Sequence, residues 1–157
     1  LRTSWVYGPV GNNFCLTMLR LHSLRAASGE PLYVVADQLG CPTSTNTLAQ
    51  ACWKTIFLEG YDEAHRRLHW SDAGVASWYD FAQAIGELAV EIGLLSQSAK
   101  VRPIKTEDYP TPAQRPTYSL LDCFDTRVAL SLEPTHWRQA LLKVLKQVQE
   151  SNSLVLN

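Results

Sequence analysis

The sequence predicts an α/β fold, because segments with strand-like and helix-like patterns alternate along the chain. Short runs of β-branched and aromatic residues are followed by segments whose apolar residues recur at helical spacing. Hydrophobic residues make up 46% of the 157-residue chain and charged residues 18%, which is enough for a packed core and too little charge for a disordered chain. We therefore expect one globular domain, or one large piece of a two-domain protein.

Two strands and one loop are expected in the first third of the chain. Residues 1–7 have the content of a strand, which Gly8-Pro9 ends. Residues 32–35, Leu-Tyr-Val-Val, predict a second strand. Residues 37–43 follow as a polar loop that contains Gly and Pro. This loop lies between a strand end and a helix start, where open α/β sheets usually place ligand contacts.

Two helices are expected in the same part of the chain. The first should begin after Asn12 or Asn13, either of which can cap it, and should end at Ser28-Gly29. It is apolar on more than one face, which indicates burial between layers or contact with a second subunit. The second helix should bury a face that carries Leu48, Cys52 and Ile56.

The middle of the chain predicts a short strand and a core helix. The strand covers residues 68–70, and Ser77 with Asp80 predicts a capping box at the start of the helix. The broad apolar stripe of this helix should face the core. Its members are Trp78, Phe81, Ala82, Ile85, Leu88, Ala89 and Ile92.

The C-terminal third begins with an expected strand over residues 101–105. Residues 109–116 contain three prolines, so they can form neither a regular helix nor a central strand and should cross the surface as a shaped loop. A last helix should start near Thr135, and residues 151–157 are expected to fray.

Charge excludes several classes of partner. The formal net charge is −1 and the sequence pI is about 6.5, so the chain lacks the basic footprint of a duplex-DNA binder or of a polybasic membrane-surface protein. No apolar stretch approaches the length needed to cross a bilayer, and the start lacks the basic region of a secretory leader. We expect neither nucleic acid nor membrane as a partner.

The cysteines and histidines do not predict a metal site. The four cysteines are scattered without C-x-x-C pairs, so each is expected to be a reduced, mostly buried thiol in a cytoplasmic protein. His65 and His69 lie four residues apart, but the arginines between them favour a solvated segment over metal binding.

Four separated stretches carry a resemblance to a known family: Arg2–Gly8, Asp37–Thr43, Ser77–Ala82 and Pro112–Asp122. In this order and spacing, over nearly the whole chain, they resemble the dTDP-4-dehydrorhamnose reductases of the extended short-chain dehydrogenase/reductase superfamily. The resemblance implies the C-terminal substrate-binding part of an NAD(P)-binding Rossmann-type protein. Residues 1–8 would be the last part of the Rossmann-type sheet, residues 9–150 the substrate domain and residues 151–157 a frayed tail.

The cofactor and catalytic motifs of that superfamily are not found in the sequence. Gly8 and Gly11 have the first spacing of a glycine-rich turn, but Phe14 stands where the third glycine belongs. No Tyr is followed by Lys four positions later, so the tyrosine acid and its lysine partner are missing. We therefore expect no catalytic residue here, and no reductase activity from this chain alone.

The reaction that the resemblance implies is hydride transfer from a nicotinamide to the C4 keto group of dTDP-6-deoxy-L-lyxo-4-hexulose, which gives dTDP-L-rhamnose. The expected cofactor is NADPH or NADH, bound mainly by the missing N-terminal Rossmann domain. The expected partners are a nucleotide-sugar substrate, that missing domain and, because members of the family often dimerise, a second copy of the chain.

Two residues are the candidate substrate-binding residues. The resemblance places Trp5 against the sugar, and a flat indole offers an apolar face to the C–H face of a pyranose. The alternative for Trp5 is an ordinary core aromatic at a strand end. Arg115 lies between prolines on a loop, and its planar guanidinium suits a diphosphate or a deoxythymidine carbonyl. The alternative for Arg115 is a surface salt bridge.

Other polar and aromatic residues of the four stretches are expected to be structural. Hydrogen bonds that hold the loop in shape are the favoured role of Asp37, Gln38 and Thr43. Trp78, Tyr79 and Phe81 open the helix with the apolar stripe, so they are expected in the core and without a ligand.

Two other functions stay open at this point. One is a non-catalytic relative that resembles the β regulatory subunit of methionine adenosyltransferase, which belongs to the same branch of the superfamily. The other is a nucleotide-sugar epimerase or dehydratase, which the reductase-like sequence of residues 37–43 disfavours. In every case, a cut sheet with an open edge predicts self-association or dependence on a missing half.

Overall fold

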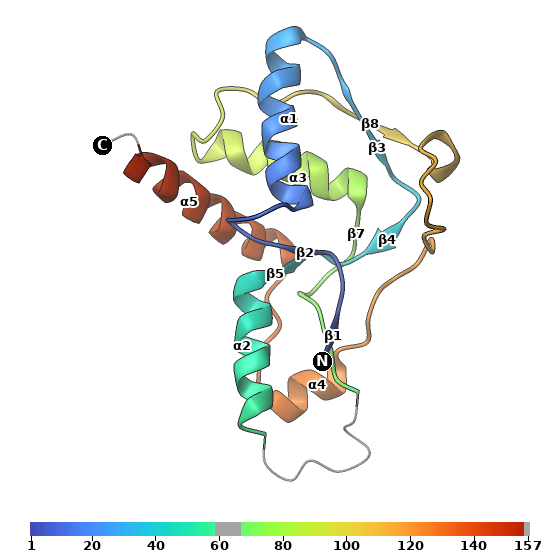
Figure 1. Ribbon diagram of the computed structural model, residues 1–157, viewed down its shortest axis with the longest axis vertical. Helices are drawn as coiled ribbons and strands as arrows, with labels where there is room; N and C mark the ends of the chain where they lie inside the picture. The colour runs from blue at the N-terminus through green and yellow to red at the C-terminus, as the bar shows by residue number, and fades with distance from the viewer. Residues whose placement is uncertain (59–66, 156–157) are drawn as a thin grey trace.

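The computed structural model describes residues 1–58 and 67–155, the last four of these by their backbone only, and confirms the α/β class (Figure 1). A short 3-10 helix spans Thr106–Asp108. The helices and strands are β1 (Arg2–Thr3), β2 (Val6–Tyr7), α1 (Phe14–Ser28), β3 (Leu32–Val35), β4 (Leu39–Gly40), β5 (Thr43–Ser44), α2 (Thr45–Ile56), β6 (His69–Trp70), β7 (Ala76–Ser77), α3 (Trp78–Glu91), β8 (Val101–Ile104), α4 (Phe124–Leu130) and α5 (Trp137–Val155).

The described strands pair two by two. Three pairs are parallel, namely β1 with β6, β2 with β5 and β3 with β8, whereas β4 and β7 pair antiparallel. Each partner comes from a distant part of the sequence. In Figure 1, α1, α3, β3 and β8 occupy one end of the molecule, α2, α4 and β1 occupy the other, and β2, β4, β5 and β7 lie at the junction. The junction is where the predicted site residues meet.

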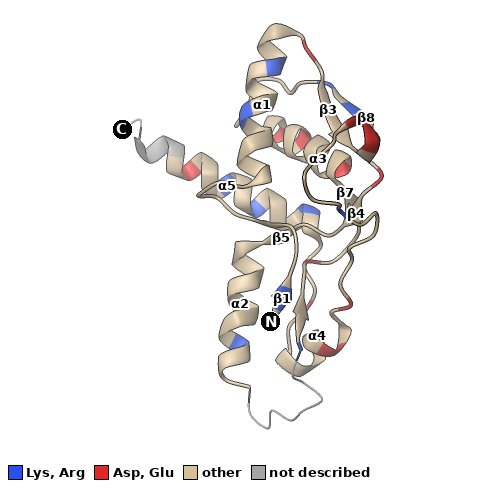
Figure 2. Ribbon diagram, turned by 45° about the vertical axis from the view of Figure 1, so that its right-hand side comes forward, with Lys and Arg blue, Asp and Glu red and all other residues tan. Residues whose placement is uncertain are grey.

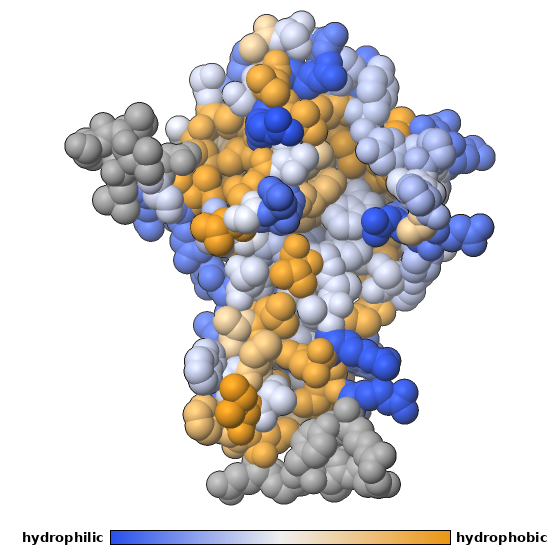
Figure 3. All heavy atoms as spheres, in the orientation of Figure 1, coloured by the Kyte–Doolittle hydropathy of each residue, from blue (hydrophilic) through white to orange (hydrophobic). Residues whose placement is uncertain are grey.

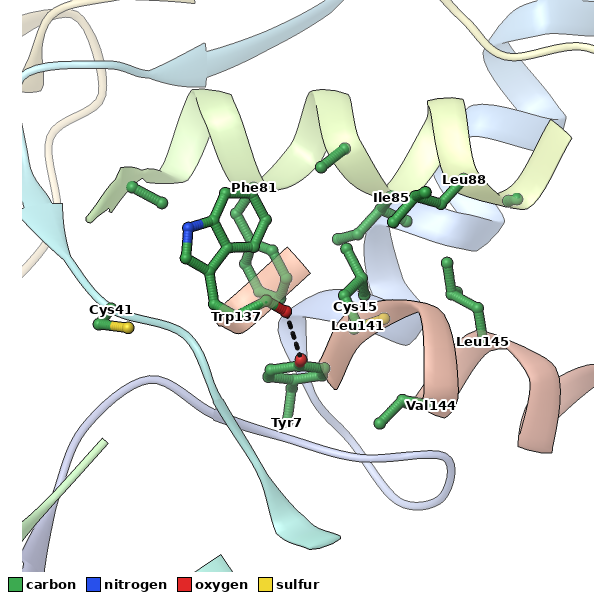
Figure 4. Close-up of a cluster of buried hydrophobic side chains, with 13 residues drawn as sticks. Tyr7, Cys15, Cys41, Phe81, Ile85, Leu88, Trp137, Leu141, Val144 and Leu145 are labelled. Atoms are coloured by element: carbon green, nitrogen blue, oxygen red, sulfur yellow. Dashed lines mark hydrogen bonds between the residues drawn. The ribbon is translucent and has the colours of Figure 1, made fainter. Parts of the chain in front are cut away.

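The main core lies where α3, α5 and the N-terminal segment pack together (Figure 4). The Phe81 ring contacts Tyr7 and Trp137 edge-to-face, with ring centroids 5.0 and 6.0 Å apart. The Tyr7 hydroxyl donates a hydrogen bond to the Trp137 carbonyl at 3.5 Å. Burial raises the pKa of Tyr7, so it stays protonated as a donor. Tyr7 therefore ties the segment that carries Trp5 to the core.

The helix ends follow the signals predicted from sequence. The Asn13 side chain accepts a hydrogen bond from Leu16 N, and Gly29 ends α1 in the left-handed conformation with φ 72°. Ser77 and Asp80 form the expected reciprocal capping box on α3. These signals are local, so they specify the helix boundaries independently of the tertiary fold.

The predicted first strand is wrong in one respect. Residues 1–7 form two short strands rather than one, and the break falls at Ser4-Trp5. Trp5 has φ 51°, in the left-handed region that residues with a side chain rarely adopt. The two halves pair with different partners, β6 and β5, so the chain turns at Trp5 to reach both.

The buried face predicted for α2 is also wrong. Cys52 and Ile56 are exposed and Leu48 is partly buried, whereas the residue that α2 buries fully is Ala51. Ala51 packs with Trp70 and Leu130 in a small cluster between α2, β6 and α4, and α4 itself was not predicted. The apolar residues Cys52 and Ile56 lie on a second face of α2, which no described residue covers.

The cysteines agree with the prediction at three of four positions. All four thiols are free; Cys15, Cys41 and Cys123 are buried, and Cys52 is exposed. Burial raises the pKa of Cys15 and Cys41 to about 12, so both remain protonated and unreactive at neutral pH.

Two further differences concern loops and the C-terminus. Residues 37–43 are not wholly irregular, because β4 and the start of β5 lie in this segment. The described backbone of helix α5 continues to Val155, into the segment that is expected to fray.

Buried Asp72 joins several of these segments. It is 2% exposed, and its carboxylate accepts hydrogen bonds from Ser44 N at 3.0 Å and from the Thr47 hydroxyl at 2.5 Å. The carbonyl of Asp72 accepts from the Cys41 thiol at 3.0 Å and from the Arg127 guanidinium at 3.4 Å. One residue thus holds the start of α2, the β4–β5 link and α4 together.

The buried histidine between α1 and α3 gives a pH prediction. His22 is 1% exposed, its Nε2 lies 2.9 Å from the Ala82 carbonyl, and its Nδ1 has no partner. Burial lowers its pKa below the usual 6.5. Above this value both the folded and the unfolded chain hold a neutral imidazole. Below it the unfolded chain binds a proton more readily than the folded one, so stability must fall as the pH falls.

We expect the free energy of unfolding, measured by urea denaturation, to fall between pH 7.5 and 5.5, and this slope to become shallower in His22→Gln. Burial raises the pKa of Asp72, so this residue makes the free energy of unfolding rise as the pH falls. The effect of His22 is therefore measured as the difference between the slopes of the wild type and His22→Gln. His136→Gln, at an exposed position, should keep the wild-type slope. Equal slopes in wild type and His22→Gln would contradict the prediction.

Candidate functional site

A pocket of about 270 Å³ lies at the junction, and its wall contains both predicted substrate-binding residues. Trp5 comes from the break between β1 and β2, and Arg115 comes from the proline-containing loop more than a hundred residues later. The complete lining is Ser4, Trp5, Gln38, Trp78, Arg115, Pro116 and Ser119. The pocket therefore combines residues from all four stretches that carry the family resemblance.

The indole of Trp5 is stacked on that of Trp78. Their ring centroids are 3.6 Å apart and their planes differ by 7°. Trp78 is the first residue of α3, so the Ser77 capping box fixes its backbone. One face of Trp5 is thus covered by a ring that the core also holds, because Phe14 packs on Trp78 at 4.7 Å.

Gly40 covers the other face of Trp5. A Cβ at this glycine would lie 2.5 Å from Cε2 of Trp5, 2.7 Å from Cζ2 and 2.8 Å from Nε1. Cε2 is bonded to both other atoms and is the nearest of the three, so the glycine lies over the ring face rather than at its edge. No atom of Trp78 is among these nearest neighbours, which places Trp78 on the opposite face. Only glycine permits this approach.

A chain of hydrogen bonds holds Trp78 in place. Trp78 Nε1 donates to Gln38 Oε1 at 3.2 Å, and Gln38 Nε2 donates to the Thr106 hydroxyl at 3.1 Å. Asp37 accepts from Thr106 through both its backbone N–H, at 2.9 Å, and its hydroxyl, at 2.7 Å. These hydrogen bonds from Thr106 lower the pKa of Asp37. The structural roles expected for Asp37 and Gln38 are confirmed, and Thr43 is fully buried.

Arg115 is brought to the pocket by a short pairing beside β4. Leu39 N donates to the Thr117 carbonyl at 2.8 Å, and Ser119 N donates to the Leu39 carbonyl at 2.8 Å. The loop that carries Arg115 is therefore attached to the strand that carries Gly40. Arg115 itself is exposed, and no described residue forms a salt bridge with it. The alternative of a surface salt bridge is not observed among the described residues.

A larger groove of about 590 Å³ adjoins the pocket and shares Gln38, Trp78 and Arg115 with it. Its floor is mostly apolar, and its polar groups include the Arg25 guanidinium and two threonines. The remaining lining is Phe14, Thr17, Met18, Leu21, Arg25, Pro31, Leu32, Tyr33, Val34, Val35, Tyr109 and Thr111. The two cavities meet at Arg115, and Trp78 forms a wall of both.

Sequence reasoning missed two residues of the site. The core position predicted for Phe81 is confirmed, but Trp78 is only partly buried and lines both cavities. Its position at the first turn of the helix, next to a cap, is the signal that it could reach the surface. Ser4 was not singled out, and nothing in its sequence context distinguishes it.

The described residues contain neither a cluster of metal-ligating side chains nor a pyrophosphate-binding turn at the partial glycine pattern of residues 8–14. No group of three metal-ligating side chains occurs among them, and His65 lies outside the described part. At the third position of the glycine pattern, Phe14 packs between Trp78 and Phe81, with centroids 4.7 and 5.5 Å apart. A ring packed between two other rings leaves no open turn for a pyrophosphate at this position. Helices of the described region are too short or too polar to span a membrane.

Comparison with known families identifies the family to which the chain belongs. A family model described as the RmlD substrate binding domain matches residues 1–150. This chain belongs to that family. A curated RmlD-type relative, the dTDP-4-dehydrorhamnose reductase of Aggregatibacter actinomycetemcomitans, is 39% identical over 146 residues, which are 92% of this chain and 48% of the relative.

Solved structures agree with the RmlD assignment. The chain superimposes on a dTDP-4-dehydrorhamnose reductase from Clostridium acetobutylicum with a TM-score of 0.79 at 36% identity, over 94% of this chain and 48% of that one. A reductase from Bacillus anthracis, solved in complex with NADP, gives a TM-score of 0.77 at 33% identity, over 93% and 47%. The chain thus spans about half the length of its relatives.

The chain of hydrogen bonds behind Trp78 gives a test of the site's construction. In Gln38→Met we expect Trp78 to lose its acceptor and the stack to loosen, because a methionine fills similar space but offers no amide. The near-ultraviolet circular dichroism of the stacked indoles should weaken.

The control is Gln83→Met, on the exposed side of α3, where the side chain bonds only to Glu87. This variant should keep the wild-type spectrum. An unchanged spectrum in Gln38→Met would show that the stack does not depend on Gln38.

Proposed function

We propose that this chain is the sugar-nucleotide-binding part of an NAD(P)H-dependent dTDP-4-dehydrorhamnose reductase, which reduces dTDP-6-deoxy-L-lyxo-4-hexulose to dTDP-L-rhamnose. The observation that carries the proposal is the meeting of Trp5 and Arg115 in one pocket built from the four family-like stretches. The names of the matched relatives support it.

The two adjoining cavities suit the two parts of such a ligand. The small pocket beside Trp5 has the size and the polar rim for a sugar ring, and the larger apolar groove has room for a nucleoside. Arg115 stands where the cavities meet, and a guanidinium at that point suits the diphosphate that joins sugar to nucleoside. Arg25 also lines the groove, but its guanidinium is paired with the Glu30 carboxylate, so Arg115 is the cation that we assign to the phosphates.

The stack changes how Trp5 would contact a sugar. Trp78 and Gly40 cover the two faces of the indole, so the sugar cannot lie flat on either face in this arrangement. We infer that Trp5 contacts the sugar with its edge and that its role is to position the ring in the pocket. The expected face-to-face contact is replaced by this edge contact.

In this proposal, the hydride transfer takes place on a part of the protein outside this chain. A bound NAD(P)H would supply the hydride, and a Rossmann-type half would hold it, because residues 8–14 of this chain do not form a pyrophosphate-binding turn. The residues of this chain bind and orient the nucleotide sugar. We propose that the chain alone does not reduce its substrate.

An open sheet edge and an apolar surface support a missing half as partner. The described part of the chain pairs β1 on one edge only, with β6, and parallel strands rarely occur outside larger covered sheets. Figure 3 shows apolar side chains gathered over β1 and α2, and the exposed ones include Leu1, Ile56 and Phe57. Charged residues are interspersed along the molecule (Figure 2).

The free thiols of the chain suit a reducing compartment such as the cytoplasm.

The regulatory relative and the epimerase are the less supported alternatives. Several relatives between 32% and 39% identical carry the name dTDP-4-dehydrorhamnose reductase. A regulatory subunit would not need a pocket that accepts a sugar nucleotide. Binding of the nucleotide sugar therefore separates a reductase part from a regulatory subunit.

The test is calorimetric titration of the 157-residue chain with dTDP-L-rhamnose. We expect binding in the wild type, and affinity about tenfold weaker in Trp5→Ala and in Arg115→Ala, because each removes a pocket contact. NADPH should give no heat of binding.

Matched controls are Trp53→Ala on α2 and Arg20→Ala on α1, both exposed and outside the two cavities. Both should bind like the wild type. No binding of dTDP-L-rhamnose to the wild type, or equal weakening in the controls, would contradict the proposal.

The uncovered apolar surface also predicts self-association of this chain. We expect the average mass in sedimentation velocity to rise with concentration, because exposed Ile56 and Phe57 (68% and 74%) favour association. Replacing both with Lys should suppress the rise, whereas Leu24→Lys on α1 should not. A monodisperse monomer at high concentration would refute this prediction.

A further inference from the structure

One polar group in the wall of the small pocket has no use in the fold. Ser4 lines the pocket beside Trp5, but its hydroxyl is shielded from solvent and has no hydrogen-bond partner. A buried hydroxyl without a partner costs free energy, and the great majority of such groups in folded proteins are paired. The fold itself therefore gives no reason for a serine here.

The position of Ser4 is fixed by its neighbours. It lies in the break between β1 and β2, with paired residues Thr3 and Val6 on either side of the Ser4-Trp5 dipeptide. The left-handed backbone of Trp5 sets the direction of the turn. The backbone of Ser4 is therefore held, while its hydroxyl can rotate about a single bond between three staggered positions.

A second unused donor lies next to Ser4. Trp5 Nε1 has no acceptor among the described residues, whereas the stacked Trp78 uses its own N–H on Gln38. Because both faces of the Trp5 ring are covered, its polar edge is what the ring can offer a ligand. Two neighbouring residues of the pocket lining thus carry hydrogen-bonding groups that no described residue uses.

We propose that Ser4 is a ligand-binding residue of this pocket, whose hydroxyl rotates to hydrogen-bond a sugar hydroxyl that the Trp5 N–H also contacts. This inference rests on the proposed function, which puts the sugar in this pocket. A sugar hydroxyl both donates and accepts, so it can accept from the indole and donate to the serine. Arg115 lines both the small pocket and the larger groove, whereas Ser4 lines the small pocket only, so we assign Ser4 to the sugar and not to the nucleotide.

The test compares Ser4→Ala with the wild type against two ligands, dTDP-L-rhamnose and dTDP. We expect affinity for dTDP-L-rhamnose to fall about fivefold, as for one lost hydrogen bond, and affinity for dTDP to stay within about twofold. The melting temperature should not fall, because the hydroxyl has no partner to leave unpaired in the protein. Trp5→Phe, which keeps an aromatic ring but lacks the N–H, should show the same selectivity for the sugar.

Ser23→Ala, at an exposed position on α1, is the matched control and should change neither affinity. Equal affinity of wild type and Ser4→Ala for dTDP-L-rhamnose overturns the inference, and so does equal weakening toward both ligands or a lowered melting temperature. If the wild type binds dTDP and dTDP-L-rhamnose equally, the inference fails while nucleotide binding stands. If it binds neither, the proposed function fails and the inference fails with it.

Discussion

The buried carboxylate of Asp72 is the interaction on which the junction of this fold depends. A charged group at 2% exposure is costly, and here two hydrogen bonds from the start of α2 offset part of that cost. The effect of burial is larger than that of these hydrogen bonds, because the pKa of Asp72 is raised. The carboxylate thus holds the first turn of α2 in place only while both of its donors stay in position.

The pocket depends on this junction through β5. Ser44, whose N–H bonds Asp72, also belongs to β5, and β5 pairs with β2 in the register Val6↔Thr43 and Tyr7↔Ser44. The pairing fixes the residue that follows Trp5, while β1 and β6 fix the residues that precede Ser4. The position of the indole is therefore set by contacts with segments far along the chain rather than by its local sequence.

Local signals made part of this structure predictable. Helices α1 and α3 carry N-cap signals in the sequence, so Asn12 or Asn13 indicated the start of α1, Gly29 its end, and Ser77 with Asp80 the start of α3. The two-residue strands have no comparable signal, because each exists only through a distant partner. The same limit explains the wrong burial prediction for Cys52. The apolar period of α2 predicts a buried face but does not specify which segment covers it.

The candidate site likewise contains residues that the local sequence indicated and contacts that depend on distant segments. Trp5 and Arg115 were predictable from the stretches that surround them, and the structure places both in one pocket. The stack of Trp5 on Trp78 was not predictable, because it requires β4 and β7 to pair and bring Gly40 and α3 to opposite faces of one ring.

Backbone strain gives a separate physical reason to place a binding site at Trp5. A tryptophan at φ 51° costs about 1–3 kcal/mol relative to an ordinary conformation, so it persists only where its surroundings determine it. Here the pairs β1–β6 and β2–β5 hold both sides of the break, and Trp78 and Gly40 hold the ring. An extended backbone at Trp5 would relieve the strain and continue β1 into β2, but the turn lets these two strands pair with different partners, β6 and β5. The strained turn thus costs stability at the position where we propose ligand binding, and strained residues of this kind cluster at functional sites.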